Sequence, residues 1–225
     1  MMPPASPNDF PSPREAERNA LVDSFLSEPG SRISDPRIIA AMRATPRHLF
    51  IPLDQRSEAY GDYPLPIGFG QTISQPSLVA FMTEQLRPGP GDRILEIGTG
   101  SGYQAAVLSP LVAEVYSIEI LEPLATRAKV TLASLGYDNV HTRFGNGYLG
   151  WPEESPFDAI MVTCAPEDIP HALIEQLREG GRIIIPVGPP TEPQELYLLE
   201  KREGKMEKKA ILPVRFVPMT GSNER

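Results

Sequence analysis

The sequence has little cysteine and histidine, and it has no long apolar run. Its one cysteine, Cys164, cannot form an internal disulfide. The three histidines, His48, His141 and His171, lack the spacing typical of metal ligands, so we expect no metal site. No apolar stretch approaches the ~20 residues that cross a membrane, and no signal-peptide pattern opens the chain. These absences favour a soluble, cytoplasmic protein.

Positive charge is also scarce. The chain has 21 lysines and arginines against 29 aspartates and glutamates, which gives a net charge of −8 at pH 7. A negative surface repels phosphate backbones instead of collecting them. We therefore expect no nucleic-acid partner and no membrane partner, and we expect the protein to be monomeric.

The length of 225 residues and the hydrophobic fraction of 40% suit one globular domain. Residues 1–13 are rich in proline and poor in large apolar side chains, so they are predicted to form a disordered tail. Residues 14–225 are predicted to form a single domain. We divide it into N-terminal helices and a substrate loop over 14–91, a cofactor-binding sheet over 92–190 and a C-terminal hairpin over 191–225.

Apolar spacing predicts the secondary structure. Two N-terminal helices are expected over 14–30 and 34–46, the second capped by Ser34 or Asp35 with Pro36 in its first turn. Strands are then predicted at 93–97, 114–120, 139–144, 157–163 and 181–187, with helices at 122–136 and 167–181. A hairpin of 194–202 and 208–219 follows. This order is typical of an α/β fold with a doubly wound, Rossmann-like sheet, mostly parallel with an antiparallel C-terminal edge.

Three glycines follow the first strand of that sheet, in the segment GTGSG at 98–102. Glycine permits a tight turn and a close approach of the backbone to a ligand, and a helix is predicted to begin near Tyr103. A strand, a glycine turn and a helix in this order are typical of a nucleotide-cofactor site. The dinucleotide fingerprint would have a glycine where Tyr103 stands, which weakens the hypothesis of an NAD enzyme.

Two carboxylates accompany the glycine loop. Glu96 precedes it at the end of the first strand, and its negative charge suits a cation without phosphate better than a pyrophosphate. S-adenosylmethionine is such a cofactor, with an ammonium and a sulfonium group. Glu119 ends the second strand, where an acidic side chain can accept both ribose hydroxyls. We therefore predict S-adenosylmethionine as the cofactor, with no metal.

Two further loops follow strands of the predicted sheet. Asn146 and Gly147 follow the third strand and could contact an adenine edge, although Asn-Gly is also an ordinary turn pair. Cys164 follows the fourth strand. No acid–base partner stands beside it, so we interpret it as a small buried filler and not as a nucleophile.

Six segments together resemble one family. The segments are PRHLFIP (46–52), LPIGFGQTISQP (65–76), ILEIGTGSGYQ (94–104), FDAIMVTCAP (157–166), LREGGRIIIPVG (177–188) and VRFVPM (214–219). In this order and spacing they resemble the protein-L-isoaspartate (D-aspartate) O-methyltransferases, over residues from about 20 to 220. The glycine loop alone would mark any class I methyltransferase, whereas GQTISQP is the specific part.

The resemblance implies a class I methyltransferase fold and an enzyme that repairs aged proteins. It would transfer a methyl group from S-adenosylmethionine to the α-carboxylate of L-isoaspartyl residues in peptides and damaged proteins, with D-aspartyl residues as a second class left open. The ester then closes to a succinimide, whose hydrolysis returns some aspartate. Because a carboxylate with a pKa near 4 is ionised at pH 7, the reaction needs no general base, and the enzyme's work is mainly alignment.

The resemblance also implies roles for individual residues. Ser74 stands at the position of the active-site serine, and we predict that its hydroxyl orients the substrate carboxylate. The implied cofactor residues are Gln75, Pro76, Ser77, Glu96, Gly98, Thr99, Gly100, Ser101, Gly102, Glu119, Asn146 and Gly147. The implied substrate residues are Thr72, Ile73, Ser74, Pro186, Val187, Val214 and Phe216. Two positions depart from the family pattern: Asn146 replaces an aspartate and Cys164 replaces an alanine.

Three alternatives remain open. A class I methyltransferase acting on another substrate would share the glycine loop and Glu119 but not the GQTISQP and VRFVPM segments. A non-enzymatic module would bind S-adenosylmethionine without methylating any isoaspartyl peptide. An NAD-dependent oxidoreductase would bind NADH.

Overall fold

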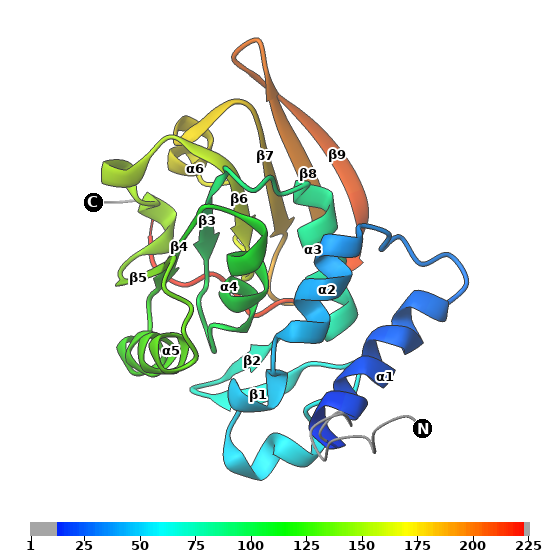
Figure 1. Cartoon of the computed structure of the whole chain (residues 1–225). Coiled ribbons are helices and arrows are strands. Elements are labelled where there is room, and N and C mark those ends of the chain that lie inside the picture. Colours follow the sequence, from blue (N-terminus) through cyan, green and yellow to red (C-terminus); the bar gives the residue numbers. More distant parts are fainter. Residues whose placement is uncertain (1–12, 223–225) are drawn as a thin grey trace, which may run out of the picture.

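The apolar runs after Asp92 form a seven-stranded sheet in the computed structural model, which describes residues 13–222 (Figure 1). Its strands lie in the order β5-β4-β3-β6-β7-β8-β9, and a separate hairpin pairs β1 with β2. The helices are α1 Pro13–Ser27, α2 Pro36–Ala44, α3 Pro76–Leu86, α4 Tyr103–Leu108, α5 Glu122–Ser134 and α6 His171–Glu175. The strands are β1 Leu65–Gly68, β2 Gln71–Ile73, β3 Arg93–Ile97, β4 Glu114–Glu119, β5 Val140–Phe144, β6 Phe157–Val162, β7 Leu177–Val187, β8 Gln194–Arg202 and β9 Lys205–Val214.

Five strands of the sheet are parallel, so their carboxyl ends meet at one edge. In the centre, Ile97 of β3 is level with Ile118 of β4 and Val162 of β6. Chain order runs outward in opposite directions from this centre, which creates the switch point where ligands bind in doubly wound sheets. β8 and β9 add an antiparallel edge beyond β7, as predicted.

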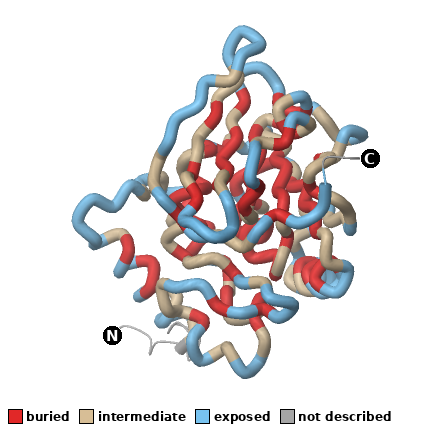
Figure 2. Tube along the Cα trace, turned by 180° about the vertical axis from the view of Figure 1, so that it is seen from behind, coloured by how far each residue is buried: buried red, intermediate tan, exposed pale blue. Residues whose placement is uncertain are grey.

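Each central strand serves two hydrophobic cores, because successive side chains point to opposite faces. Ile94 packs in the core shared with α1 to α5, whereas its neighbour Leu95 packs in the core shared with α6. Figure 2 shows the buried residues concentrated along the central strands, with exposed segments at the periphery. Burial on both faces explains why the strand sequences are continuous apolar runs.

The β1–β2 hairpin lies beyond the carboxyl edge of the sheet, whereas α1 to α3 pack beside it (Figure 1). Asp35 caps α2 by accepting a hydrogen bond from Arg37 N at 2.9 Å, and Pro36 occupies the first turn, as predicted. Between α2 and α3, the chain forms the β1–β2 hairpin, in which Leu65 pairs with Ile73. The GQTIS part of the predicted substrate loop is therefore partly a strand.

The predicted helix over 167–181 is wrong in its second half. Only His171–Glu175 is helical, and β7 already begins at Leu177. Leu173 and Leu177 have helical spacing and pack in the same core, but Leu177 is paired with Phe157 of β6. Gly181 lies so close to β6 that a Cβ there would be 2.9 Å from the Asp158 carbonyl oxygen. Strand pairing thus overrides the helical pattern.

The C-terminal segment leaves the sheet earlier than predicted. β9 ends at Val214, and the chain then crosses to the end of β6, where Ala165 and Pro218 form an isolated parallel bridge. Most of the predicted disordered tail lies outside the described residues, and α1 begins at Pro13. No helix within 13–222 is long and apolar enough to cross a membrane.

Candidate functional site

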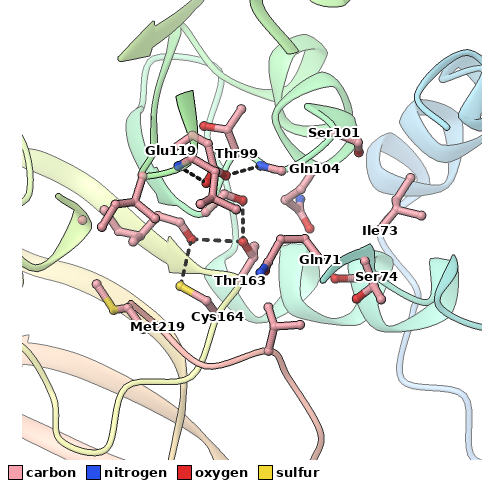
Figure 3. Close-up of a pocket in the computed structure, with 18 of the residues that line it drawn as sticks. Gln71, Ile73, Ser74, Thr99, Ser101, Gln104, Glu119, Thr163, Cys164 and Met219 are labelled. Carbon is pink, nitrogen blue, oxygen red and sulfur yellow. Dashed lines mark hydrogen bonds between the residues drawn. The ribbon is translucent and has the colours of Figure 1, made fainter. Parts of the chain in front are cut away.

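A cavity opens at the carboxyl ends of β3, β4 and β6, and we call it the central cavity (Figure 3). Its empty volume, counted out into the open mouth, is about 780 Å³. It is lined by 71–74, 97–101, 118–121, 163–164 and 217–220, with Val79, Tyr103, Gln104 and Gly147. The cavity therefore lies at the switch point of the sheet.

The glycine loop forms one wall of the central cavity. Gly98, Gly100 and Gly102 have φ angles of 98°, 53° and 88°, in the left-handed region that favours glycine. A Cβ on Gly98 would lie 2.6 Å from Thr163 Oγ1. The amides of Gly98 and Thr99 donate to the Ile118 carbonyl oxygen at 2.9 and 3.2 Å, so the loop is fixed to β4.

Glu119 is held at this wall by two backbone amides. Its Oε2 accepts from Gly100 N at 2.7 Å, and its Oε1 accepts from Leu121 N at 2.9 Å. A carboxylate oxygen can accept more than one hydrogen bond, so each oxygen retains acceptor capacity toward the cavity. In Figure 3, Glu119 lies on the opposite side of the cavity from Ser74.

Glu96 is fully buried behind the loop and does not line the central cavity. The Ser117 hydroxyl donates to its Oε2, and Thr99 Oγ1 lies 2.6 Å from Ser117 Oγ. Oε1 has no hydrogen-bond partner among the described residues. Burial raises the pKa of Glu96 to about 8 and outweighs the opposing Ser117 hydrogen bond. Near pH 7 this carboxyl group is therefore largely neutral, which the charge argument from the sequence did not foresee.

Thr163 and Cys164 directly follow β6 and line the central cavity next to the glycine loop. Thr163 Oγ1 lies 2.7 Å from the Gly98 carbonyl oxygen and 3.0 Å from that of Ile97. Cys164 is half-buried and lines the cavity, so it is more exposed than the small buried filler that we expected. Burial raises the pKa of the Cys164 thiol well above its ordinary value, so the thiol stays protonated and is a poor nucleophile.

A second depression, which we call the groove, adjoins the central cavity. It is lined by Pro64, Thr72, Ser74, Gln75, Leu78, Thr163 and 212–217. Thr72, Ser74, Thr163 and Val217 line both depressions. Ser74 is half-buried at this junction, and its hydroxyl makes no hydrogen bond to another residue within 13–222. It is free to bind a ligand that spans the cavity and the groove.

Most of the predicted site residues come together here. Those that line the central cavity or the groove are Thr72, Ile73, Ser74, Gln75, Gly98, Thr99, Gly100, Ser101, Glu119, Gly147, Val214 and Phe216. Those that line neither are Pro76, Ser77, Glu96, Gly102, Asn146, Pro186 and Val187. The ligand contacts assigned to all of these positions stay predictions.

The predicted residues that line neither depression have other neighbours. Asn146 Nδ2 donates to the Ser222 carbonyl oxygen at 2.7 Å, and its Oδ1 accepts from Tyr148 N at 3.1 Å. Pro186 is buried within β7. A Cβ on Gly102 would lie 3.1 Å from Leu132 of α5, so this glycine allows close helix packing.

Sequence reasoning missed part of the lining. Residues 217–220 reach the central cavity because Ala165 N donates to the Val217 carbonyl oxygen and Met219 N donates to the Ala165 carbonyl oxygen, both at 2.8 Å. No local pattern signals this contact, since it joins segments about 50 residues apart. Ile120 and Leu121 were also missed, although they directly follow Glu119.

The sheet order, the glycine loop and the Glu119 carboxylate held by two amides define a doubly wound α/β protein with a nucleotide-cofactor site. Residues 16–224 match the family described as Protein-L-isoaspartate(D-aspartate) O-methyltransferase (PCMT). The chain therefore belongs to this family, which confirms the resemblance stated from the six segments.

Individual relatives agree with this assignment. The chain is 56% identical over 207 residues to Protein-L-isoaspartate O-methyltransferase of Opitutus terrae, which covers 92% of this chain and 88% of the relative. It is 53% identical over 206 residues to Protein-L-isoaspartate O-methyltransferase 2 of a Polaromonas species, covering 91% and 98%.

Solved structures agree as well. A protein-L-isoaspartate O-methyltransferase shares 33% identity and a TM-score of 0.81, covering 93% of this chain and 66% of that chain. A putative enzyme of this type from Plasmodium falciparum, in complex with S-adenosyl-L-homocysteine, shares 26% identity and a TM-score of 0.79, covering 90% and 98%. These matches confirm the predicted fold and the class of activity, methyl transfer from S-adenosylmethionine to a protein carboxylate.

Proposed function

We propose that this protein methylates the α-carboxylate of L-isoaspartyl residues in aged proteins and peptides. S-adenosylmethionine binds in the central cavity, the peptide lies in the groove, and Ser74 orients the substrate carboxylate between them. The resulting ester closes to a succinimide, and hydrolysis of the succinimide returns part of the material to aspartate. We further propose a cytoplasmic monomer whose partners are damaged proteins. Its net charge of −8 disfavours nucleic acid and anionic membrane surfaces.

The polar groups of the central cavity fit this cofactor. Glu119 is preorganised by two backbone amides and retains acceptor capacity for ribose hydroxyls. No lysine or arginine occurs among the residues that line the cavity, within the part of the chain that the structure describes. A pyrophosphate would find no cationic side chain there, whereas a cofactor with a sulfonium and an ammonium group needs none. These observations favour S-adenosylmethionine over a dinucleotide.

The position of Ser74 is the observation that carries this proposal. Ser74 lines both the central cavity and the groove, and its hydroxyl has no partner among residues 13–222. A hydroxyl can donate to a carboxylate and hold it in line with a methyl donor bound on the other side. The groove continues along 212–217, where backbone groups can pair with an extended peptide whatever its side chains.

The chemistry needs little else from the protein. When bound, S-adenosylmethionine supplies an electrophilic methyl group. A substrate carboxylate with a pKa near 4 is already a nucleophilic anion at pH 7, so no residue has to remove a proton. The Cys164 thiol lies in the same cavity, and because burial raises its pKa it stays protonated and does not compete for the methyl group.

The experiment compares two peptides that differ only in an aspartyl or isoaspartyl linkage, each with labelled S-adenosylmethionine. We expect label in the isoaspartyl peptide alone. The variant Ser74→Ala should lower kcat about 10- to 100-fold, because carboxylate alignment is lost. Its dissociation constant for S-adenosylhomocysteine should stay within about twofold, because the cofactor wall is intact.

Ser24→Ala is the matched control, because Ser24 lies on α1 and its hydroxyl bonds, within residues 13–222, only the Leu21 carbonyl oxygen of its own helix. It should keep the turnover of the parent protein. Label in neither peptide would reject the proposed substrate, and full turnover by Ser74→Ala would reject the role of Ser74.

A further inference from the structure

The helix that follows Ser74 begins without a local side-chain cap. Gln75 occupies the cap position of α3, yet its side chain makes no capping hydrogen bond, and Pro76 stands in the first turn. The first-turn amide of Ser77 is satisfied instead by Asp62, which lies 15 residues upstream, before β1. Asp62 Oδ1 accepts from Ser77 N at 2.8 Å. A remote carboxylate therefore replaces the usual local cap.

The same carboxylate also contacts the residue before the proline. Asp62 Oδ2 accepts from Gln75 Nε2 at 3.0 Å. The two hydrogen bonds lie on either side of Pro76, and Ser74 immediately precedes Gln75. Because the Ser74 hydroxyl has no partner among the described residues, the place of Ser74 depends on how this backbone is held. Asp62 ties this backbone by two side-chain hydrogen bonds to the segment before β1.

The segment that carries Asp62 is held in turn by a buried arginine, Arg47. Arg47 is fully buried, and its Nη2 donates at 3.2 Å to the carbonyl oxygen of Tyr63, the neighbour of Asp62. The Arg47 guanidinium lies over the ring of Tyr103, 5.1 Å from its centroid, and Tyr103 lines the central cavity. Burial lowers the pKa of Arg47 to about 10, so Arg47 remains a cation at pH 7 and attracts the Asp62 carboxylate. Asp62 thus lies between buried Arg47 and the segment that contains Ser74.

We propose that Asp62 is a positioning residue for methyl transfer. Its carboxylate holds the segment from Ser74 to Ser77 so that the Ser74 hydroxyl faces the junction of the central cavity and the groove. Asp62 touches neither the cofactor nor the substrate, and it acts through Ser74. This inference rests on the role proposed above for Ser74.

The variant Asp62→Ala removes both hydrogen bonds. We expect kcat to fall about tenfold, because a small displacement of an aligning group has a large effect on rate. The dissociation constant for S-adenosylhomocysteine should stay within about twofold. Gln75 and Ser77, which the resemblance assigns to the cofactor, do not line the central cavity, and the glycine loop and Glu119 are not touched. If Asp62→Ala does not fold, Asp62→Ser keeps a small polar group and supports the same comparison.

Asp92→Ala is the matched control. Asp92 is likewise a loop carboxylate, it accepts from Gly89 N at 2.7 Å, and it lines neither depression. Asp92→Ala should lower the melting temperature about as much as Asp62→Ala does. It should keep kcat within about twofold of the parent protein. Asp62→Asn should restore most of the lost turnover, because its amide can still accept from Ser77 N and can pair with a rotated Gln75 amide.

A double-mutant cycle with Ser74→Ala decides whether Asp62 acts through Ser74. We expect Asp62→Ala to cost less than about twofold in kcat once Ser74 has been replaced. An equal tenfold loss in both backgrounds would overturn the inference, and so would unchanged turnover in Asp62→Ala alone. If Ser74→Ala itself keeps full turnover, the proposed role of Ser74 fails instead, so the two failures are distinguishable.

Discussion

The two sides of the central cavity are built in different ways. The cofactor side, residues 97–101 and 118–121, continues directly from β3 and β4, and its amides and carboxylate are bonded to one another. The substrate side, residues 71–75 and 212–217, is brought to the cavity by Asp62 and by the bridge at Ala165. The cofactor side is bonded directly to the ends of two sheet strands. The substrate side is held by a few contacts outside those strands, so it can be disturbed without disturbing the first.

The largest expected effect is a loss of cofactor affinity on the cofactor side. Gly98→Ala would place a Cβ 2.6 Å from Thr163 Oγ1 at a φ of 98°, so the loop has to move. Strain of a few kcal/mol predicts at least ~100-fold weaker binding of S-adenosylhomocysteine, measured by calorimetry. Gly91→Ala is the control, because its Cβ would meet no atom within 4 Å. Unchanged affinity in Gly98→Ala would show that the cofactor side is more adaptable than its hydrogen bonds indicate.

A smaller effect is expected on the substrate side. Phe216 is half-buried and lines the groove. Phe216→Ala removes apolar contact with the peptide worth about 1.4 kcal/mol, so KM for an isoaspartyl peptide should rise about tenfold. The affinity for S-adenosylhomocysteine should not change. Phe144→Ala, at a ring that is 57% exposed on β5, should leave both quantities unchanged. A loss of cofactor affinity in Phe216→Ala would contradict the independence of the two sides.

The smallest expected effect is a change in how stability depends on pH. It concerns Glu96, the buried carboxyl behind the glycine loop. The pKa of Glu96 is raised to about 8 from its ordinary value of 4.5, so the folded state binds more protons than the unfolded state between these values. The stability contributed by this group is present below about pH 4.5 and is lost as pH rises to about 8, by up to ~1.4 kcal/mol per pH unit. Glu96→Gln should remove this slope, measured by urea unfolding from pH 5 to 9.

An exposed carboxylate provides the control for that slope. Glu192→Gln changes a side chain on the surface and should keep the pH dependence of the parent protein. If the stability of Glu96→Gln falls with rising pH as steeply as that of the parent protein, Glu96 is not the group that titrates.

Local patterns located the glycine loop and Glu119 on the cofactor side, although they missed Ile120 and Leu121. Gly98 and Gly100 follow one strand that the apolar runs predict, Glu119 ends the next, and all three line the cavity. Parallel strands end at one edge of a sheet, so their loops must meet there. Glu96 also follows this rule, but its side chain points into the protein, because alternation along β3 decides which face a residue occupies.

The substrate side was less accessible to such reasoning. Ser74, Val214 and Phe216 were named from resemblance, and the structure brings them to one groove. Residues 217–220 were not foreseen, because their contact with Ala165 has no period or turn signal. The predicted helix over 167–181 failed for a related reason: pairing with β6 decided the structure from Leu177 onward.

The sequence by itself determined the alternating order of strands and helices, the glycine loop after the first sheet strand and the family, because each is signalled by residues that are neighbours in the chain. Only the tertiary structure decided how Ser74 meets the cofactor cavity, that Asp62 caps the helix that follows, and that Glu96 is buried and largely neutral. These properties depend on contacts between separate elements of the fold, and their burial and partners exist only once the chain has folded.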